Sequence, residues 1–138
     1  MIALLLAIDL CASAQDIIHT APAAFERVRG AKRVDEGKTV VWSDPVKVPG
    51  ADRCKVIEYK DGSPPFYACE MAASGCAAAE KKFADATREL STCFSAETRQ
   101  SDDGKKKTAR FHPHAIPVRL TFTRGNTCDF RFFIEPLK

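Results

Sequence analysis

Two histidines, His112 and His114, flank Pro113 and come closer than any other residues to a recognisable chemical site. On a strand, residues i and i+2 face the same way, so two imidazoles at this spacing could ligate one metal ion. No second motif supplies a third ligand, and Pro113 disfavours regular strand geometry. We therefore expect two exposed loop histidines and no cofactor, with a metal site as the alternative.

Cys76 is the candidate nucleophile, because it stands at the start of a predicted helix whose dipole would lower the pKa of the thiol. A catalytic thiol needs a base within reach, and the chain offers only His19, His112 and His114. The sequence contains no glycine-rich phosphate loop, no G-x-S-x-G elbow and no H-E-x-x-H motif. We expect a binding protein more than an enzyme, and an enzyme that uses Cys76 with the histidines is the alternative.

Basic residues are dense in residues 104–110, and Arg119, Arg124 and Arg131 follow. Such residues could form a patch for a polyanion, an acidic protein or an anionic lipid surface. Asp102 and Asp103 precede the run as counter-charges, so we favour a solvated loop there. The net charge of +3 is too small to indicate a nucleic-acid partner.

One segment, residues 74–94, has sustained helical periodicity. Its apolar side chains fall within an arc of about 100°, and its charged side chains cover the opposite side. Ser74 is the expected N-cap. The pattern predicts one long helix, about residues 75–94, that packs on one face of a sheet.

A hairpin is predicted from residues 54–59 and 66–72, and residues 39–43 predict a further strand. If Asp61 and Gly62 form a two-residue turn, Cys54 lies opposite Cys69. The prolines at 64 and 65 disfavour that turn, and a loop two residues longer would place Cys54 opposite Met71.

The last hairpin is predicted from two runs that alternate apolar and polar residues, 118–123 and 128–134. For both apolar sets to share a face the loop must be odd in length, roughly residues 123–127, for example with Phe122 opposite Cys128. Arg119, Arg131 and Phe133 then fall on the solvent-facing side. Because an aromatic ring beside arginines is typical of protein interfaces, we predict a binding surface centred on these three residues.

Residues 1–14 predict an export signal peptide, since an apolar run precedes the small residues of a cleavage site at 12–14. No Lys or Arg precedes this run and Asp9 interrupts it, which indicates a translation start upstream of Met1. The run is far shorter than the ~20 residues of a membrane span. Residues 15–138 are then expected to form a single domain.

Export would leave an odd number of cysteines in a compartment that permits disulfides. Cys76 and Cys93 cannot bond, because 17 residues of helix separate them by about 25 Å. We predict the pairs Cys54–Cys69 and Cys93–Cys128, with Cys76 as the odd thiol, while other connectivities stay open.

The predicted fold is therefore α+β: an antiparallel sheet built from hairpins, one long helix on one face, and disulfides that stabilise both. The predicted function is a periplasmic or secreted, non-catalytic binding or accessory module. Its expected partner is a protein or an anionic envelope component, with no nucleic acid and no transmembrane span. A structural envelope component linked through the odd thiol is the second alternative, and the oligomeric state stays open.

Overall fold

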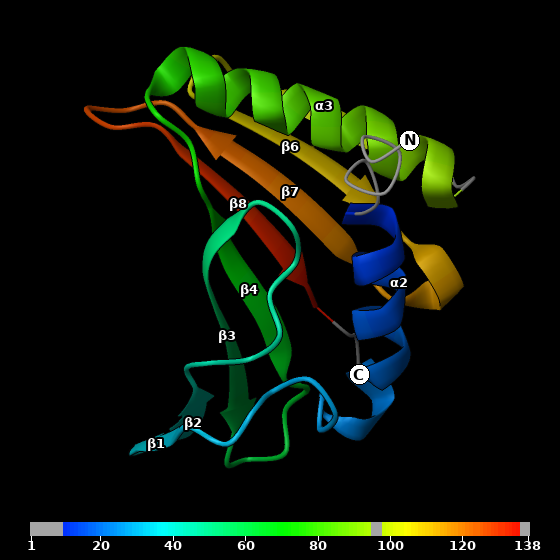
Figure 1. Ribbon diagram of the computed structural model, residues 1–138, viewed down its shortest axis with the longest axis vertical. Helices are drawn as coiled ribbons and strands as arrows, with labels where there is room; N and C mark the ends of the chain where they lie inside the picture. The colour runs from blue at the N-terminus through cyan, green and yellow to red at the C-terminus, as the bar shows by residue number, and fades with distance from the viewer. Residues whose placement is uncertain (1–9, 95–97, 136–138) are drawn as a thin grey trace, which may run out of the picture.

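Two helices lie on one face of an antiparallel sheet in the computed structural model, which describes residues 10–94 and 98–135 except the side chain of residue 114 (Figure 1). The described elements are α2 (Leu10–Thr20), η1 (Ala21–Ala23), β1 (Arg33–Glu36), β2 (Thr39–Trp42), β3 (Ala51–Tyr59), β4 (Phe66–Met71), α3 (Cys76–Phe94), β5 (Arg99–Asp102), β6 (Lys106–Phe111), η2 (Pro113–Ala115), β7 (Val118–Thr123) and β8 (Asp129–Ile134). The predicted α+β class with a disulfide-stabilised antiparallel sheet is confirmed.

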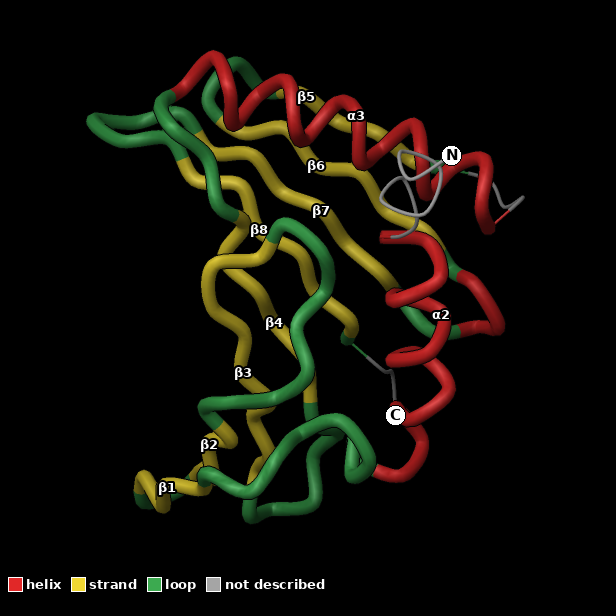
Figure 2. Tube along the Cα trace, in the orientation of Figure 1, coloured by secondary structure: helices red, strands yellow, loops and turns green. Residues whose placement is uncertain are grey.

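The sheet of the described residues has eight strands in the order β1-β2-β3-β4-β8-β7-β6-β5. The chain runs twice through a helix followed by four strands, and the last strand of each half, β4 and β8, pair at the centre. Each half therefore contributes one side of a continuous sheet (Figure 2). Both helices cover the same face, which leaves the other sheet face without a described helix.

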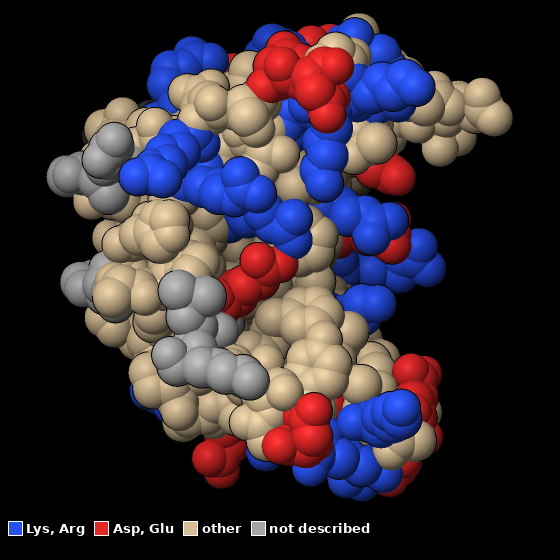
Figure 3. Space-filling model, turned by 180° about the vertical axis from the view of Figure 1, so that it is seen from behind, with Lys and Arg blue, Asp and Glu red and all other residues tan. Residues whose placement is uncertain are grey.

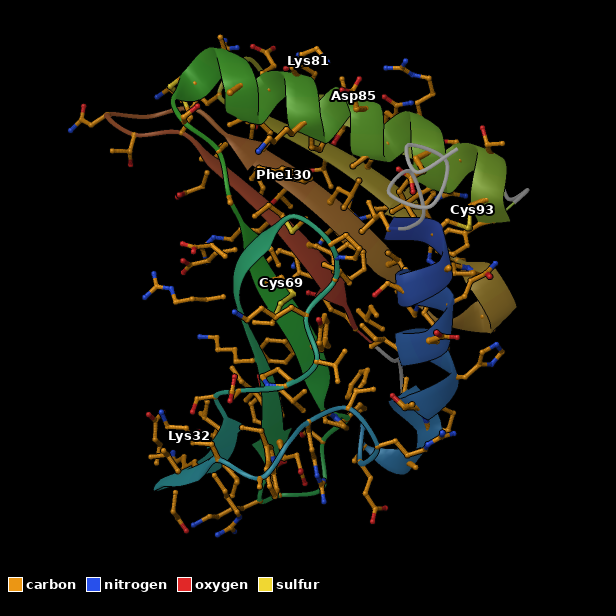
Figure 4. All side chains as sticks on the ribbon, in the orientation of Figure 1. Lys32, Cys69, Lys81, Asp85, Cys93 and Phe130 are labelled. Atoms are coloured by element: carbon orange, nitrogen blue, oxygen red, sulfur yellow. A yellow bond between two sulfur atoms is a disulfide. The ribbon has the colours of Figure 1, made fainter. Side chains whose placement is uncertain are left out.

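Helix α3 packs as its periodicity predicts. Phe83 lies 6.3 Å from Phe122 and 5.9 Å from Phe130, ring centroid to ring centroid, and Leu90 is fully buried. Lys81 and Asp85 form an ion pair on the solvent side of the helix (Figure 4). The predicted N-cap is wrong by one residue, because the helix begins at Cys76 and the carbonyl of Gly75 accepts the first helical bond, from Ala79.

Helix α2 occupies a region where the sequence predicted no long element. Ile17 and Ile18 are 1% exposed and Ala14 is fully buried, so the helix is part of the core. The amide of Cys11 donates a hydrogen bond to Glu89 on α3, 3.1 Å away. Residues 1–9 of the predicted signal peptide lie outside the described residues, and a cut after Ala14 would remove the first turn and a half of α2. Cleavage there stays a prediction.

The first hairpin has the register that makes Cys54 and Cys69 direct partners. The ladder between the two strands nevertheless stops at the pair Ile57 and Phe66, so residues 58–65, which include both prolines, lie outside it. The last hairpin has the predicted odd loop, now residues 124–128, and pairs Phe122 with Phe130. The example register with Cys128 is therefore shifted by two residues, which keeps the same faces.

Two edge strands, β1 and β5, were not predicted from the sequence. β1 and β5 are exposed at every residue, so neither has the apolar alternation that marks a half-buried strand. Residues 95–108, predicted as a polar connection, contain all of β5 and the start of β6. Their pairing is decided by neighbouring strands rather than by their own composition.

Three disulfides join Cys11 to Cys93, Cys54 to Cys69 and Cys76 to Cys128. The prediction of Cys54–Cys69 is confirmed. The prediction of Cys93–Cys128 is wrong, as is the odd thiol at Cys76. Cys128 lies at the β7–β8 turn beside the start of α3, whereas Cys93 lies at the other end of that helix, next to α2 (Figure 4). The disulfides indicate an oxidising setting.

Candidate binding surface

The sheet face turned away from α2 and α3, which we call the outer face, carries the three predicted binding residues. Leu120 and Phe132 are fully buried on the helix side, so alternation along β7 and β8 directs Arg119, Arg131 and Phe133 to the outer face. Figure 3, which views the molecule from behind, shows Lys and Arg side chains gathered in a band across this side.

Arg119 and Phe133 are direct cross-strand partners. The Arg119 guanidinium lies 4.3 Å from the centroid of the Phe133 ring and also bonds Glu135. The arginine side chain is 24% exposed. Stacking on the ring and pairing with Glu135 hold this guanidinium in one orientation. Arg119 and Phe133 therefore form a preorganised part of the surface.

Arg131 precedes Phe133 by two residues on β8, so it lies on the same face in the neighbouring cross-strand row. It faces Glu70 across the β8–β4 pair at 4.0 Å, and Glu70 bonds Arg53 on β3 at 2.7 Å. The hydrogen bond from Arg53 holds the pKa of the Glu70 carboxyl below its ordinary value, and the nearby charge of Arg131 acts in the same direction. Glu70 thus stays ionised and compensates part of the positive charge in this row.

Three further cations share the outer face. Arg110 belongs to the basic run for which we favoured a solvated loop but lies on strand β6, and Arg99 and Lys55 were not candidates. Arg99 on β5 pairs with Arg110 on β6, which pairs with Arg119, and Lys55 on β3 lies opposite Ala68. Within the described part of the chain, Arg99, Arg110 and Lys55 have no carboxylate within 4.0 Å. The alternation of Ala109 and Phe111, both fully buried, is the signal that could have identified Arg110.

A hollow of about 420 Å³ opens beside these residues. Val41, Ala68 and Phe133 provide its apolar lining, while charged side chains stand around it: Asp44, Lys47, Arg53, Lys55, Glu70 and Arg131. Most of these residues come from adjacent strands of the outer face. A shallow apolar depression with a charged border resembles the centre and rim of a protein interface.

The basic run at residues 104–110 is divided between the two sheet faces. Lys107 points toward the helix and bonds Glu80 on α3 at 2.6 Å, and Arg124 bonds the same carboxylate at 3.0 Å. Asp103 accepts backbone hydrogen bonds from residues 105 and 106, as a turn requires. Of this run, Arg110 is the cation that the β6–β7 register aligns with Arg119.

The alternative chemical sites gain no support from the geometry. Cys76 is bonded to Cys128, so it holds no thiol for catalysis or for a link to another chain. His112 is exposed and precedes a short 3-10 turn at Pro113–Ala115, which removes the strand spacing that a two-histidine site required. The side chain of His114 lies outside the described residues. No group of three or more His, Cys, Asp or Glu side chains in the described parts could hold a metal ion.

Comparison with known proteins finds no matching protein family, no similar curated protein and no similar solved structure. Neither α2 nor α3 has the length and apolar character that crossing a bilayer would demand. The arrangement of the outer face is therefore the main guide to function.

Proposed function

We propose that this protein is a non-catalytic binding module, periplasmic or secreted, that docks a partner protein on its outer face. The supporting observation is the cluster at Phe133: a half-buried ring held under Arg119, next to an apolar hollow of about 420 Å³ and bordered by Arg131. Aromatic and arginine side chains carry most of the energy in protein interfaces, whereas the rim contributes little.

The three disulfides support the exported setting, because disulfides persist outside the reducing cytosol. As long as Cys11 is retained, all six cysteines are paired and a covalent envelope component would have no thiol to use. The sheet face without a described helix is the one opposite α2 and α3. A preorganised sheet face loses little conformational entropy when it docks a partner.

Site-specific photocrosslinking in the producing cell tests this proposal. A photoreactive residue at Lys55, beside the hollow, is expected to capture one partner, whereas the same residue at Lys81, on the solvent side of α3, is not. The variants Arg119→Glu and Arg131→Glu should abolish capture from Lys55, and Lys38→Glu in the β1–β2 turn is the matched charge control.

Equal capture from Lys55 and Lys81, or capture unaffected by both arginine variants, would remove the outer face as the docking site. Circular dichroism and thermal unfolding of each variant separate loss of binding from loss of fold.

A further inference from the structure

Six residues on six adjacent strands form one continuous row across the outer face, which we call the cross-strand row. Direct partners in the register connect them in the order Arg99, Arg110, Arg119, Phe133, Ala68 and Lys55. At about 4.8 Å between strands, the row is about 24 Å long. It therefore reads as three cations, two apolar residues and one cation.

The requirements of folding do not explain the three arginines at one end of the row. Like charges directly opposite each other on neighbouring strands are destabilising. Arg119 is compensated by Glu135, but Arg99 and Arg110 have no carboxylate within 4.0 Å among the described residues. An external anion would supply the missing compensation.

The centre of the row distinguishes between classes of anionic partner. A uniform polyanion, such as a nucleic-acid duplex or a sulfated polysaccharide, presents charge along its whole length and gains nothing from Phe133, Ala68 and the adjacent apolar hollow. A protein segment can present carboxylates, then apolar side chains, then a further carboxylate. The mixed character of the row favours a protein.

The spacing of the row favours a helix over an extended strand. A helix presents side chains on one face about every 5.4 Å, one turn apart. An extended strand presents its same-face residues about every 6.7 Å. Neighbouring residues of the row are about 4.8 Å apart, so the helix spacing differs from the row spacing by less per step than the strand spacing does. Flexible carboxylate and guanidinium side chains can accommodate the difference that remains.

We propose that the cross-strand row binds an acidic amphipathic helix of the partner protein, lying across the strands. Carboxylates on successive turns would face Arg99, Arg110 and Arg119, apolar side chains would cover Phe133 and enter the hollow beside Ala68, and a last carboxylate would face Lys55. The carboxylate that meets Arg119 joins Glu135 on that guanidinium, which can bond two carboxylates through separate N–H groups. This proposal rests on the proposed function and adds the chemistry of its partner.

The probe is a synthetic helical peptide of about 16 residues, enough to span the row at about 1.5 Å per residue, with glutamates on its first turns, leucines in the middle and one glutamate at the end. Titration into the oxidised, isotope-labelled full chain should shift the amide resonances of β6, β7 and β8. Replacing the leucines with serine should weaken binding about tenfold or more, because the hollow then gains no apolar group. Arg110→Glu should weaken binding similarly, whereas Lys38→Glu should not; Arg110→Gln is the milder second variant.

Three results would overturn the proposal. The leucine peptide could fail to bind, the serine peptide could bind equally well, or a proline-containing peptide of the same composition could bind as tightly as the helix. Heparin and phosphatidylglycerol vesicles are the competing probes. If either binds the row with an affinity that Phe133→Ser does not change, the row is a general polyanion or membrane site.

The two proposals can fail separately. If the crosslink from Lys55 captures a partner through a segment without carboxylates, the docking face stands and the acidic helix is wrong. If that crosslink captures nothing specific while the peptide binds as described, the chemistry of the row stands and the proposed cellular function fails.

Discussion

At the scale of single residues, the outer face combines compensated and uncompensated cations. Glu70 lies between Arg53 and Arg131, and Glu135 holds Arg119, so these cations have carboxylates within 4.0 Å. Arg110 stands between two other arginines and has no such carboxylate among the described residues. Selection for fold stability alone would favour an acidic residue at this position.

Arg110→Glu is therefore expected to stabilise the fold. The change replaces two like-charge cross-strand contacts, with Arg99 and Arg119, by two opposite-charge contacts, each worth roughly 0.2–1 kcal/mol. Urea unfolding at low ionic strength measures the gain, which added salt should reduce. A lower midpoint than that of the unchanged protein would show that Arg110 is compensated within the fold and would weaken the case for an external anion.

Glu70→Gln is expected to lower the free energy of unfolding at neutral pH. In acid the difference in stability between the variant and the unchanged protein should become smaller. The pKa of Glu70 is lowered in the folded state by Arg53, so its ionised form contributes stability above its unfolded pKa. That contribution is lost as the pH falls through the lower folded pKa. Thermal unfolding between about pH 2 and pH 7 gives the comparison, with Glu26→Gln at an exposed turn as the control. A difference that grows toward acid would contradict this sign.

At the scale of elements, the interface between α3 and the sheet forms much of the hydrophobic core. Phe83 contacts the rings of Phe122 and Phe130, and Leu90 is fully buried farther along the helix. Glu80 adds ion pairs to this interface, because its carboxylate binds both Lys107 on β6 and Arg124 just after β7. A hollow of about 550 Å³ remains on this side between α3 and the strands β5 and β6. The outer face is the side of the sheet that carries no described helix.

Phe83→Ala is expected to cost about 3–5 kcal/mol, the range for large-to-small changes in a buried aromatic cluster. Lys81→Ala, on the exposed side of the same helix, should cost far less, because its pair with Asp85 is solvent-exposed. Denaturant unfolding of the oxidised proteins provides both values. Similar costs for the two variants would mean that α3 does not pack on β7 and β8 through Phe83.

At the scale of the whole molecule, the two halves are held together by the β4–β8 pair and by one long-range disulfide, Cys11–Cys93. Cys11–Cys93 ties α2 to the end of α3 across 82 residues, and Cys76–Cys128 ties the start of α3 to the last hairpin. Cys54–Cys69 acts within one hairpin. Both helices are therefore fixed relative to the sheet that carries the outer face.

The mature N-terminus decides whether Cys11–Cys93 exists in the cell. A cut after Ala14 would remove part of a helix that packs in the core and is bonded to α3 through Cys11. In place of that cut we therefore expect the secreted or periplasmic protein to retain Cys11, to carry no alkylated thiol and to be two hydrogens lighter for each of its three disulfides. Non-reducing mass spectrometry after iodoacetamide treatment measures all three properties. A chain that begins at Gln15 with one alkylated thiol, at Cys93, would instead establish cleavage after Ala14 and remove this disulfide.

The sequence by itself determined the elements whose own residues alternate between core and solvent. The period of about 3.6 residues in α3 and the period of two in β7 and β8 follow from which side chains must leave water. The same alternation placed Arg119, Arg131 and Phe133 on one face, and the parity of the hairpins identified Cys54 and Cys69 as possible partners.

The tertiary structure alone decided the features that depend on neighbours far along the chain. The strands β1 and β5 are exposed throughout, so hydrogen bonding to an adjacent strand, and not burial, makes them strands. Pairing of Cys76 with Cys128 and of Cys93 with Cys11 depends on which end of α3 meets the last hairpin and which meets α2. The cross-strand row requires the registers of six strands at once. No local pattern contains that information, because each register is set by contacts between segments distant in sequence.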